Sequence, residues 1–259
     1  MQRGWDCLAR FGQRLAGLSA SQVRAVATQT LREAHNRDEF LEPAVHLLGF
    51  PIEVISGQEE ACLIYQGVAQ ALPSANQRRL VIDIGGRSTD LIVGVNAQAG
   101  PMASYPVGSV LWSMRFFPDG QFSEAAFAQA EAAAQHTLAP AQSFCSSDQW
   151  DICYGSAGTV NAVVDALCVA GWPAGLVSRA GLDWLLQELL AAQTVSRLNL
   201  SGMREDRKAI IGGGLSILRA LFDLLQITCL EQAAGGLRHG LLAQLRQQTQ
   251  CQKSESLTV

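Results

Sequence analysis

The pattern of apolar and polar positions divides the first 70 residues into short helices and strands. Leu8, Phe11, Leu15 and Leu18 recur at helical spacing and predict an amphipathic helix. Short β-branched apolar runs predict strands, and Gly49 is a typical residue after the last turn of a helix. The elements expected in this part are helices at 5–17, 30–36 and 38–48, strands at 23–28 and 52–55, and a further helix after Ser56.

From residue 80 onward the pattern predicts a second, larger set of elements. A polar stretch with a proline, residues 71–79, is expected to be a linker or an exposed turn. The expected strands are 80–84, 91–95, 101–105, 150–154 and 227–230, and the first three should form an antiparallel meander. The expected helices are 109–116, 123–138, 160–170, 183–193, one after Gly214, and 237–247. The glycine-rich segments 155–159 and 212–214 are expected at strand-to-helix junctions, where helix N-termini present amides to phosphate.

Composition narrows the class of protein. The 259 residues are 48% hydrophobic and 16% charged, which is typical of an ordered globular chain with a substantial core. Seven cysteines without a C-x-x-C pair suit reduced thiols, and no apolar run has the length of a membrane span, so a cytoplasmic protein with no membrane contact is expected. The net charge of −4 disfavours nucleic acid as a partner, and a homodimer is left open.

The segment 80–94 is the strongest candidate for chemistry. Two apolar strands flank the turn Gly85-Gly86-Arg87-Ser88-Thr89, and a carboxylate stands at each side of it. Asp83 lies at the end of a predicted core strand, where a hydrated Mg²⁺ held by one or two carboxylates would offset the cost of burying its charge. The turn is expected to bind phosphate through its amides and hydroxyls, and Asp90 would add a second metal ligand. The alternative is a tight hairpin whose Asp and Gly residues serve only turn geometry.

Five segments in order resemble the exopolyphosphatase and guanosine pentaphosphate phosphohydrolase (Ppx/GppA) family, over residues 8 to 247. They are Val23 to Asn36, Ile55-Ser-Gly-Gln-Glu-Glu-Ala61, Val81-Ile-Asp-Ile-Gly-Gly-Arg-Ser-Thr-Asp90, Gly155-Ser-Ala-Gly-Thr159 and Gly235-Gly-Leu-Arg-His-Gly240. The resemblance implies an actin-like, ribonuclease-H-like duplicated α/β fold with an incomplete first domain. The expected division is 1–64 for the end of the first domain, 65–250 for the second domain and 251–259 for a disordered tail. The implied reaction is Mg²⁺-assisted hydrolysis of terminal phosphate from polyphosphate, or of the 5′ γ-phosphate of guanosine pentaphosphate.

The same resemblance implies roles for individual residues. Glu60 matches the family's catalytic base and Asp83 its metal-and-phosphate aspartate, while Glu59 is left as a partner of the helix dipole. Without the family, Glu60 would also be read as a dipole partner. The implied phosphate-binding residues are Gly85, Gly86, Arg87, Ser88, Thr89, Gly158, Thr159, Arg24 and Arg32, and the implied metal ligands are Asp83 and Asp90. The sequence is equally consistent with a second interpretation, in which the side chains are solvated surface arginines that bind no phosphate; this applies to Arg24, Arg32 and Arg238.

Three departures from the family pattern keep other functions open. Arg87 replaces a glycine and Asp90 a glutamate, and an arginine there would be strained if its φ were positive. His239 stands where members usually carry glutamate. The family's first strands, with an Asp-x-Gly-Ser-Asn-Ser loop, find no match in residues 1–60, so an N-terminal truncation relative to the family is expected. The alternatives are a weak or inactive polyphosphate- or nucleotide-binding protein and an actin-like sugar or acetate kinase.

Overall fold

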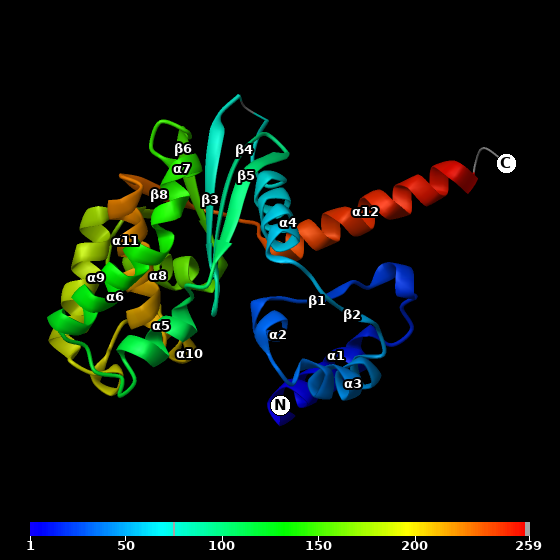
Figure 1. The fold of residues 1–259 in the computed structure, drawn as a ribbon, viewed down its shortest axis with the longest axis horizontal. Helices are drawn as coiled ribbons and strands as arrows, with labels where there is room; N and C mark the ends of the chain where they lie inside the picture. The colour runs from blue at the N-terminus through cyan, green and yellow to red at the C-terminus, as the bar shows by residue number, and fades with distance from the viewer. Residues whose placement is uncertain (75, 257–259) are drawn as a thin grey trace.

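The computed structural model describes residues 1–74 and 76–256, which form a small N-terminal lobe and a large α/β lobe (Figure 1). Position 75 of the predicted linker and 257–259 of the predicted tail lie outside the described residues. The long α12 extends away from the place where the two lobes approach each other (Figure 1). None of the helices in the described ranges is long and apolar enough to cross a membrane.

A six-stranded mixed sheet organises the large lobe. Its strands are β3 (Arg78–Ile84), β4 (Thr89–Val95), β5 (Gln98–Tyr105), β6 (Ile152–Ser156), β7 (Leu176–Ser178) and β8 (Cys229–Gln232). Their order across the sheet is β5-β4-β3-β6-β8-β7. As predicted, β3, β4 and β5 form an antiparallel meander, and β6 then pairs with β3 in parallel. Because β3 is central and buried on both faces, it reads as a continuous apolar run in the sequence.

Alternation along β3 sends side chains to two different cores. Leu80, Ile82 and Ile84 belong to the main core, whereas Val81 belongs to a smaller core on the opposite face. The helices of the main core are α5 (Ser109–Phe116), α6 (Glu124–Leu138), α8 (Ala157–Val169), α9 (Arg179–Ala192) and α11 (Ile211–Leu224), with short α7 (Gln142–Cys145) and α10 (Glu205–Lys208) at its edges. The opposite face is covered by α4 (Gly57–Ala69) and the start of α12 (Leu237–Ser256). Asp83 follows Val81 by two residues and therefore faces α4.

Glycines bring α4 and α12 into backbone contact. A Cβ on Gly235 would lie 1.9 Å from the carbonyl oxygen of Gly67, and a Cβ on Gly240 would lie 2.0 Å from that of Leu63. No side chain fits at either place, so these two glycines are needed for the close approach of the backbones. The helix that carries Glu60 is thereby held against the end of the sheet.

The small lobe is built on a two-stranded parallel sheet. Its elements are α1 (Gln2–Leu15), a 3₁₀ turn (Ala20–Gln22), β1 (Ala25–Ala27), α2 (Gln29–Glu33), α3 (Arg37–Leu48) and β2 (Ile52–Val54). Trp5 of α1 stacks on Phe40 of α3 with ring centroids 6.1 Å apart, and its indole N–H donates to the Phe40 carbonyl at 3.0 Å. Gly49 ends α3 with a φ of +80°, as the sequence predicted.

The structure corrects several local predictions. Gly212, Gly213 and Gly214 lie inside α11 rather than at a strand-to-helix junction, and the element immediately before α11 is the short helix α10. Close packing explains at least two of these glycines: a Cβ on Gly213 would lie 2.5 Å from the carbonyl oxygen of Ser109 in α5, and a Cβ on Gly214 would lie 2.6 Å from Cγ2 of Thr159 in α8. The short strand β7 was not predicted. The helix α12 continues to Ser256, past the predicted end at Gln247 and into the expected tail.

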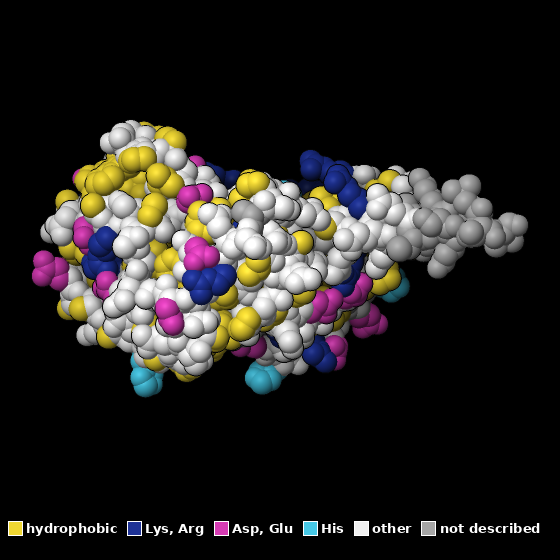
Figure 2. Space-filling view, turned by 90° about the horizontal axis from the view of Figure 1, so that it is seen from above, with side chains coloured by type: hydrophobic (Ala, Val, Ile, Leu, Met, Phe, Trp, Pro, Cys, Tyr) yellow, Lys and Arg dark blue, Asp and Glu magenta, His cyan; other side chains and the backbone are white. Residues whose placement is uncertain are grey.

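Charged side chains are distributed in small separate groups over the face seen in Figure 2, with basic and acidic groups interspersed. This pattern agrees with the modest net charge of −4. A mixed distribution of this kind steers large polyanions weakly on that face.

Candidate functional site

A row of four polar side chains crosses the large sheet at one level. Asp83 of β3 is opposite Asp90 of β4 and Ser156 of β6, and Asp90 is in turn opposite Ser104 of β5. Residues in register point to the same face, so all four point toward α4. The sheet register thus brings together the two carboxylates that the sequence proposed as metal ligands.

Asp83 is buried and hydrogen-bonded at one oxygen. The Ser156 hydroxyl donates to its Oδ2. Burial is the main cause that raises the pKa of Asp83 to about 6, and the nearby charge of Glu60 raises it further against the effect of the Ser156 bond. When such a buried carboxyl group is ionised, any cation that contacts it stabilises its negative charge.

Asp90 is more deeply buried than Asp83, and one of its carboxylate oxygens lacks a hydrogen-bond partner in the described residues. Only 1% of its surface is exposed, and its Oδ1 has no hydrogen-bond partner in the described residues, nor has the Ser104 hydroxyl oxygen. Burial first, and then the charge of Glu60, raise the pKa of Asp90 well above its usual range. Two opposed buried carboxylates with an orphaned oxygen are the kind of donor set that Mg²⁺ uses together with water and phosphate.

No group of three or more His, Cys, Asp or Glu side chains arranged to hold a metal occurs in the described ranges. A magnesium ion bound by substrate phosphates needs only one or two protein carboxylates. Asp83 and Asp90 therefore fit a metal that is completed by substrate and water.

The pH dependence of stability tests this electrostatic description. The folded protein keeps the Asp83 proton up to about pH 6, whereas the unfolded chain loses it near the ordinary pKa of 3.8. Without metal, the free energy of unfolding should therefore fall as the pH rises from 4 to 6, by up to about 3 kcal/mol for this group. Thermal unfolding in a chelator should show the fall, Asp83→Asn should reduce it, and Mg²⁺ at pH 7 should raise the Tm of the wild type more than that of the variant. If the stability of the wild type and of the variant had the same dependence on pH, the raised pKa of Asp83 would be contradicted.

Glu60 lies above the row, in the first turn of α4. Ser56 caps this helix as predicted, accepting from the amide of Glu59 at 3.1 Å. Glu60 is buried, and Arg32 Nη1 donates to its Oε2 at 2.8 Å while also bonding the Ile55 carbonyl. Burial raises the pKa of Glu60 and the Arg32 guanidinium opposes that rise. Arg32 therefore contacts the candidate base rather than lying free for phosphate.

The β3–β4 turn has amides available for an anion. In the described part of the chain, the amides of Gly86, Arg87 and Ser88 have no hydrogen-bond acceptor, which is the pattern of an anion nest. The Gly85 amide, in contrast, donates to the Ser88 carbonyl at 2.9 Å, and the Thr89 hydroxyl donates to the Val107 carbonyl at 2.6 Å. Those two predicted phosphate donors already have acceptors inside the fold.

The backbone of this turn differs from the sequence-based expectation. Gly85 and Gly86 do not have positive φ, and neither does Arg87, so the arginine causes no backbone strain. The glycine that the turn requires is Gly108, since a Cβ there would lie 2.3 Å from the Arg87 amide nitrogen. The β5–α5 connection thus supports the turn from behind.

A second glycine-containing turn joins β6 to α8. Ala157 has a φ of +68°, an uncommon conformation for a residue with a side chain, at the first position of the helix. The Thr159 hydroxyl donates to the Ile84 carbonyl at 3.1 Å, so it ties this helix to β3. A Cβ on Gly158 would lie 2.6 Å from the guanidinium of Arg207. The turn predicted to bind phosphate is therefore adjacent to the guanidinium of Arg207, which the sequence alone did not indicate as a phosphate ligand.

A basic pocket of about 610 Å³ opens between this turn and the start of α12. It is lined by Asp83, Ala157, Gly158, Asn161, Ala162, Asp165, Arg204, Arg207, Ala233, Ala234, Gly235, Gly236, Leu237, Arg238 and His239. Arg204 and Arg207 were missed because each has acidic neighbours in the sequence and looks like part of a solvated surface. Only the packing of α10 against α8 shows that they face the same cavity as Asp83.

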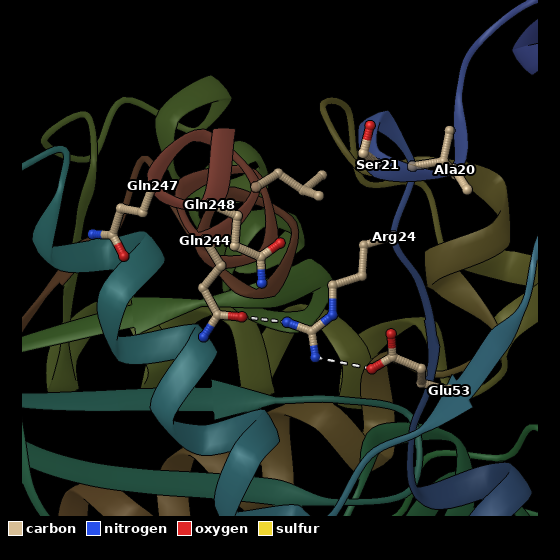
Figure 3. A pocket seen from close by; sticks show the side chains of 9 residues that line it. Ala20, Ser21, Arg24, Glu53, Gln244, Gln247 and Gln248 are labelled. Atoms are coloured by element: carbon tan, nitrogen blue, oxygen red, sulfur yellow. Dashed lines mark hydrogen bonds and ion pairs between the residues drawn. The ribbon is translucent and has the colours of Figure 1, made fainter. Parts of the chain in front are cut away.

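Arg24 lies apart from these residues. Its guanidinium pairs with Glu53 at 3.0 Å and bonds Gln244 (Figure 3). It also pairs with Glu59 at 2.7 Å. It lines a separate polar pocket of about 700 Å³ between the small lobe and α12. The structure thus brings Arg32, but not Arg24, to the carboxylate row, although both were predicted to bind phosphate.

Comparisons with known proteins identify the family of this chain. The sequence profile of the Ppx/GppA phosphatase family matches residues 1–249. The chain is 42% identical over 251 residues to the guanosine-5′-triphosphate,3′-diphosphate pyrophosphatase of Vibrio vulnificus, covering 95% of this chain and 50% of that protein. The corresponding protein of Vibrio parahaemolyticus is 40% identical over 245 residues, with 95% of this chain and 49% of that protein covered. The chain spans about half the length of the curated relatives it matches.

A solved structure shares the fold. An exopolyphosphatase from Cytophaga hutchinsonii superimposes with a TM-score of 0.82 at 23% identity, covering 95% of this chain and 81% of that chain. At this identity the likeness shows the fold alone. It confirms the α/β fold of the family that the resemblance implied.

Proposed function

Because this chain belongs to the Ppx/GppA phosphatase family, we propose that it hydrolyses the terminal 5′ phosphate of guanosine pentaphosphate. The observation that carries the proposal is the juxtaposition of Glu60, the Asp83 and Asp90 carboxylates and a turn with three unbonded amides. The relatives named for guanosine-5′-triphosphate,3′-diphosphate support this substrate over other phosphate esters.

Glu60 would act as the general base. Water attacks the γ-phosphorus, the bond from that phosphorus to the β–γ bridging oxygen breaks, and the water proton passes to the Glu60 carboxylate. A pKa raised by burial makes this carboxylate a better proton acceptor, and the bond from Arg32 Nη1 holds its orientation. Glu59, one residue earlier, points to Arg24 and has no part in this step.

Asp83 and Asp90 would hold Mg²⁺, which would neutralise charge on the phosphate oxygens. The amides of Gly86, Arg87 and Ser88 would bind oxygens of the transferred group. These donors are preorganised, because Gly108 packs on the backbone of the turn and Gly85 closes the hairpin.

The basic pocket beside Asp83 would receive the rest of the nucleotide. Guanosine pentaphosphate carries a 3′-diphosphate as well as the 5′-triphosphate, so its recognition needs cations at two places. Arg204, Arg207 and Arg238 line a cavity that adjoins the Asp83 end of the sheet, and a guanidinium binds phosphate bidentately. Inorganic polyphosphate has no second anionic arm and needs this pocket less.

Substrate comparison with an Arg207→Ala variant tests the assignment. The change should lower kcat/KM for guanosine pentaphosphate about 10- to 100-fold, because one charged hydrogen-bonding group is worth about 1.5–3 kcal/mol, and should lower tripolyphosphate hydrolysis much less. Phosphate release is the measurement.

Arg197→Ala, which removes an exposed arginine bonded to Gln193 and lying outside the pocket, is the matched control. Absence of phosphate release from guanosine pentaphosphate by the wild type would reject the proposed function. An equal loss on both substrates would instead assign the pocket to phosphate chains in general.

A further inference from the structure

One ion pair connects the phosphate-binding turn directly to the small lobe. Arg87 Nη2 of the β3–β4 turn lies 3.0 Å from Glu33 Oε2 of α2. The two residues are 54 positions apart in sequence and belong to different lobes. The pair therefore spans the boundary between the lobes at the turn that would bind the transferred phosphate.

The helix α2 contacts both the candidate base and the phosphate-binding turn. Arg32 donates to Glu60, and the next residue, Glu33, accepts from Arg87. Gln29, one turn earlier, bonds Arg32 at 2.6 Å and also donates to Glu33. Loss of the contact between Glu33 and Arg87 would thus alter the surroundings of Arg32, which orients Glu60.

Arg87 has unused hydrogen-bonding capacity. Its backbone packs closely against Gly108 and has no positive φ, so the side chain starts from a supported and unstrained position of the turn. Its Nε–H is buried and has no acceptor in the described residues, although Nη2 is paired. A guanidinium can donate two parallel hydrogen bonds to one phosphate group. A single contact with a carboxylate leaves some of its N–H donors without an acceptor.

We propose that the Glu33 carboxylate occupies the place of a phosphate oxygen on Arg87, and that an anionic ligand displaces it. This inference rests on the proposed function, because it takes the β3–β4 turn as the phosphate site. The Arg87 and Glu33 side chains are 38% and 42% exposed, and ion pairs at that exposure contribute little to stability. A doubly charged phosphate group can therefore replace the carboxylate and release α2 from the turn.

Calorimetric titration with methylenediphosphonate and Mg²⁺ tests the exchange without depending on hydrolysis. Glu33→Gln should tighten binding about threefold, because it removes the competing anion. Arg87→Gln should weaken binding about tenfold, because it removes the cation. In the double variant the affinity should equal that of Arg87→Gln alone, since Glu33 has nothing left to compete for.

The ion pair between Arg78 and Asp151 provides the matched control. It has similar exposure, 45% and 41%, and joins the opposite end of β3 to the residue before β6. Asp151→Asn should leave the affinity unchanged. Unchanged or weaker binding by Glu33→Gln, unchanged binding by Arg87→Gln, or tightening by Glu33→Gln that persists in the double variant would each overturn the exchange. If binding behaves as expected and no phosphate is released from guanosine pentaphosphate, only the proposed function fails.

Discussion

Replacing Glu60 with Gln is expected to lower kcat for phosphate release by about 10²- to 10⁴-fold. The variant keeps the shape of the side chain and an oxygen that can accept from Arg32 Nη1, which lies 2.8 Å from the carboxylate in the wild type. It removes the capacity to accept a proton from attacking water. The KM should not rise, because the change removes a negative charge that repels an anionic substrate.

Glu59→Gln is the control for this experiment. Glu59 occupies the same turn of α4 but pairs with Arg24 at 2.7 Å and is half-exposed. Its replacement should change the rate less than twofold, and methylenediphosphonate should bind both variants. Equal rates for Glu60→Gln and wild type would remove Glu60 from the mechanism, and equal losses in both variants would point to damage to α4 rather than to a missing base.

Replacing Gly235 with Ala is expected to destabilise the fold by about 3 kcal/mol, which is the upper range for overpacking. The new Cβ would lie 1.9 Å from the Gly67 carbonyl oxygen, so either α4 or the start of α12 must move. At this chain length the loss corresponds to a fall in Tm of roughly 10 °C. Thermal unfolding followed by circular dichroism is the measurement.

Gly236→Ala is an adjacent control. A Cβ at Gly236 would come no closer than 3.9 Å to its nearest neighbour, the Cβ of Ser156. Its effect on Tm should therefore be small, although both glycines precede α12 and line the same pocket. Similar losses of Tm in the two variants would show that loop flexibility, and not contact between α4 and α12, is what the glycines provide.

Much of the fold follows from local sequence. The β3–β4 hairpin was predictable because each strand contains a short apolar run next to the glycine turn. The third strand of the meander, β5, has few large apolar residues and begins at Gln98, before the predicted start at 101. Ser56 caps α4 at the predicted helix start, and Ser123 and Ser178 cap α6 and α9 in the same way. Gly212 to Gly214 were misplaced, because a glycine needed for close packing of helices has the same local signature as one needed for a turn.

The candidate site, like the fold, could be predicted from the sequence only in part. That Asp83 and Asp90 flank a glycine turn is visible in the sequence, and their strands make them neighbours once the hairpin forms. Without the family motif, Glu59 and Glu60 are indistinguishable in sequence, and so are Arg24 and Arg32 as candidate phosphate ligands. Tertiary structure separates them, because only Glu60 is buried against the sheet and paired with Arg32.

What the sequence determined by itself was the set of elements and the turn, because periodicity, caps and glycines act over a few neighbouring residues. What only the tertiary structure decided was which charges meet. The pairing of Arg87 with Glu33, the burial of Asp90 and the convergence of Arg204 and Arg207 on the Asp83 pocket join residues far apart in the chain. The energy of a charge depends on burial and on its partners, and both exist only after the lobes and sheet are assembled.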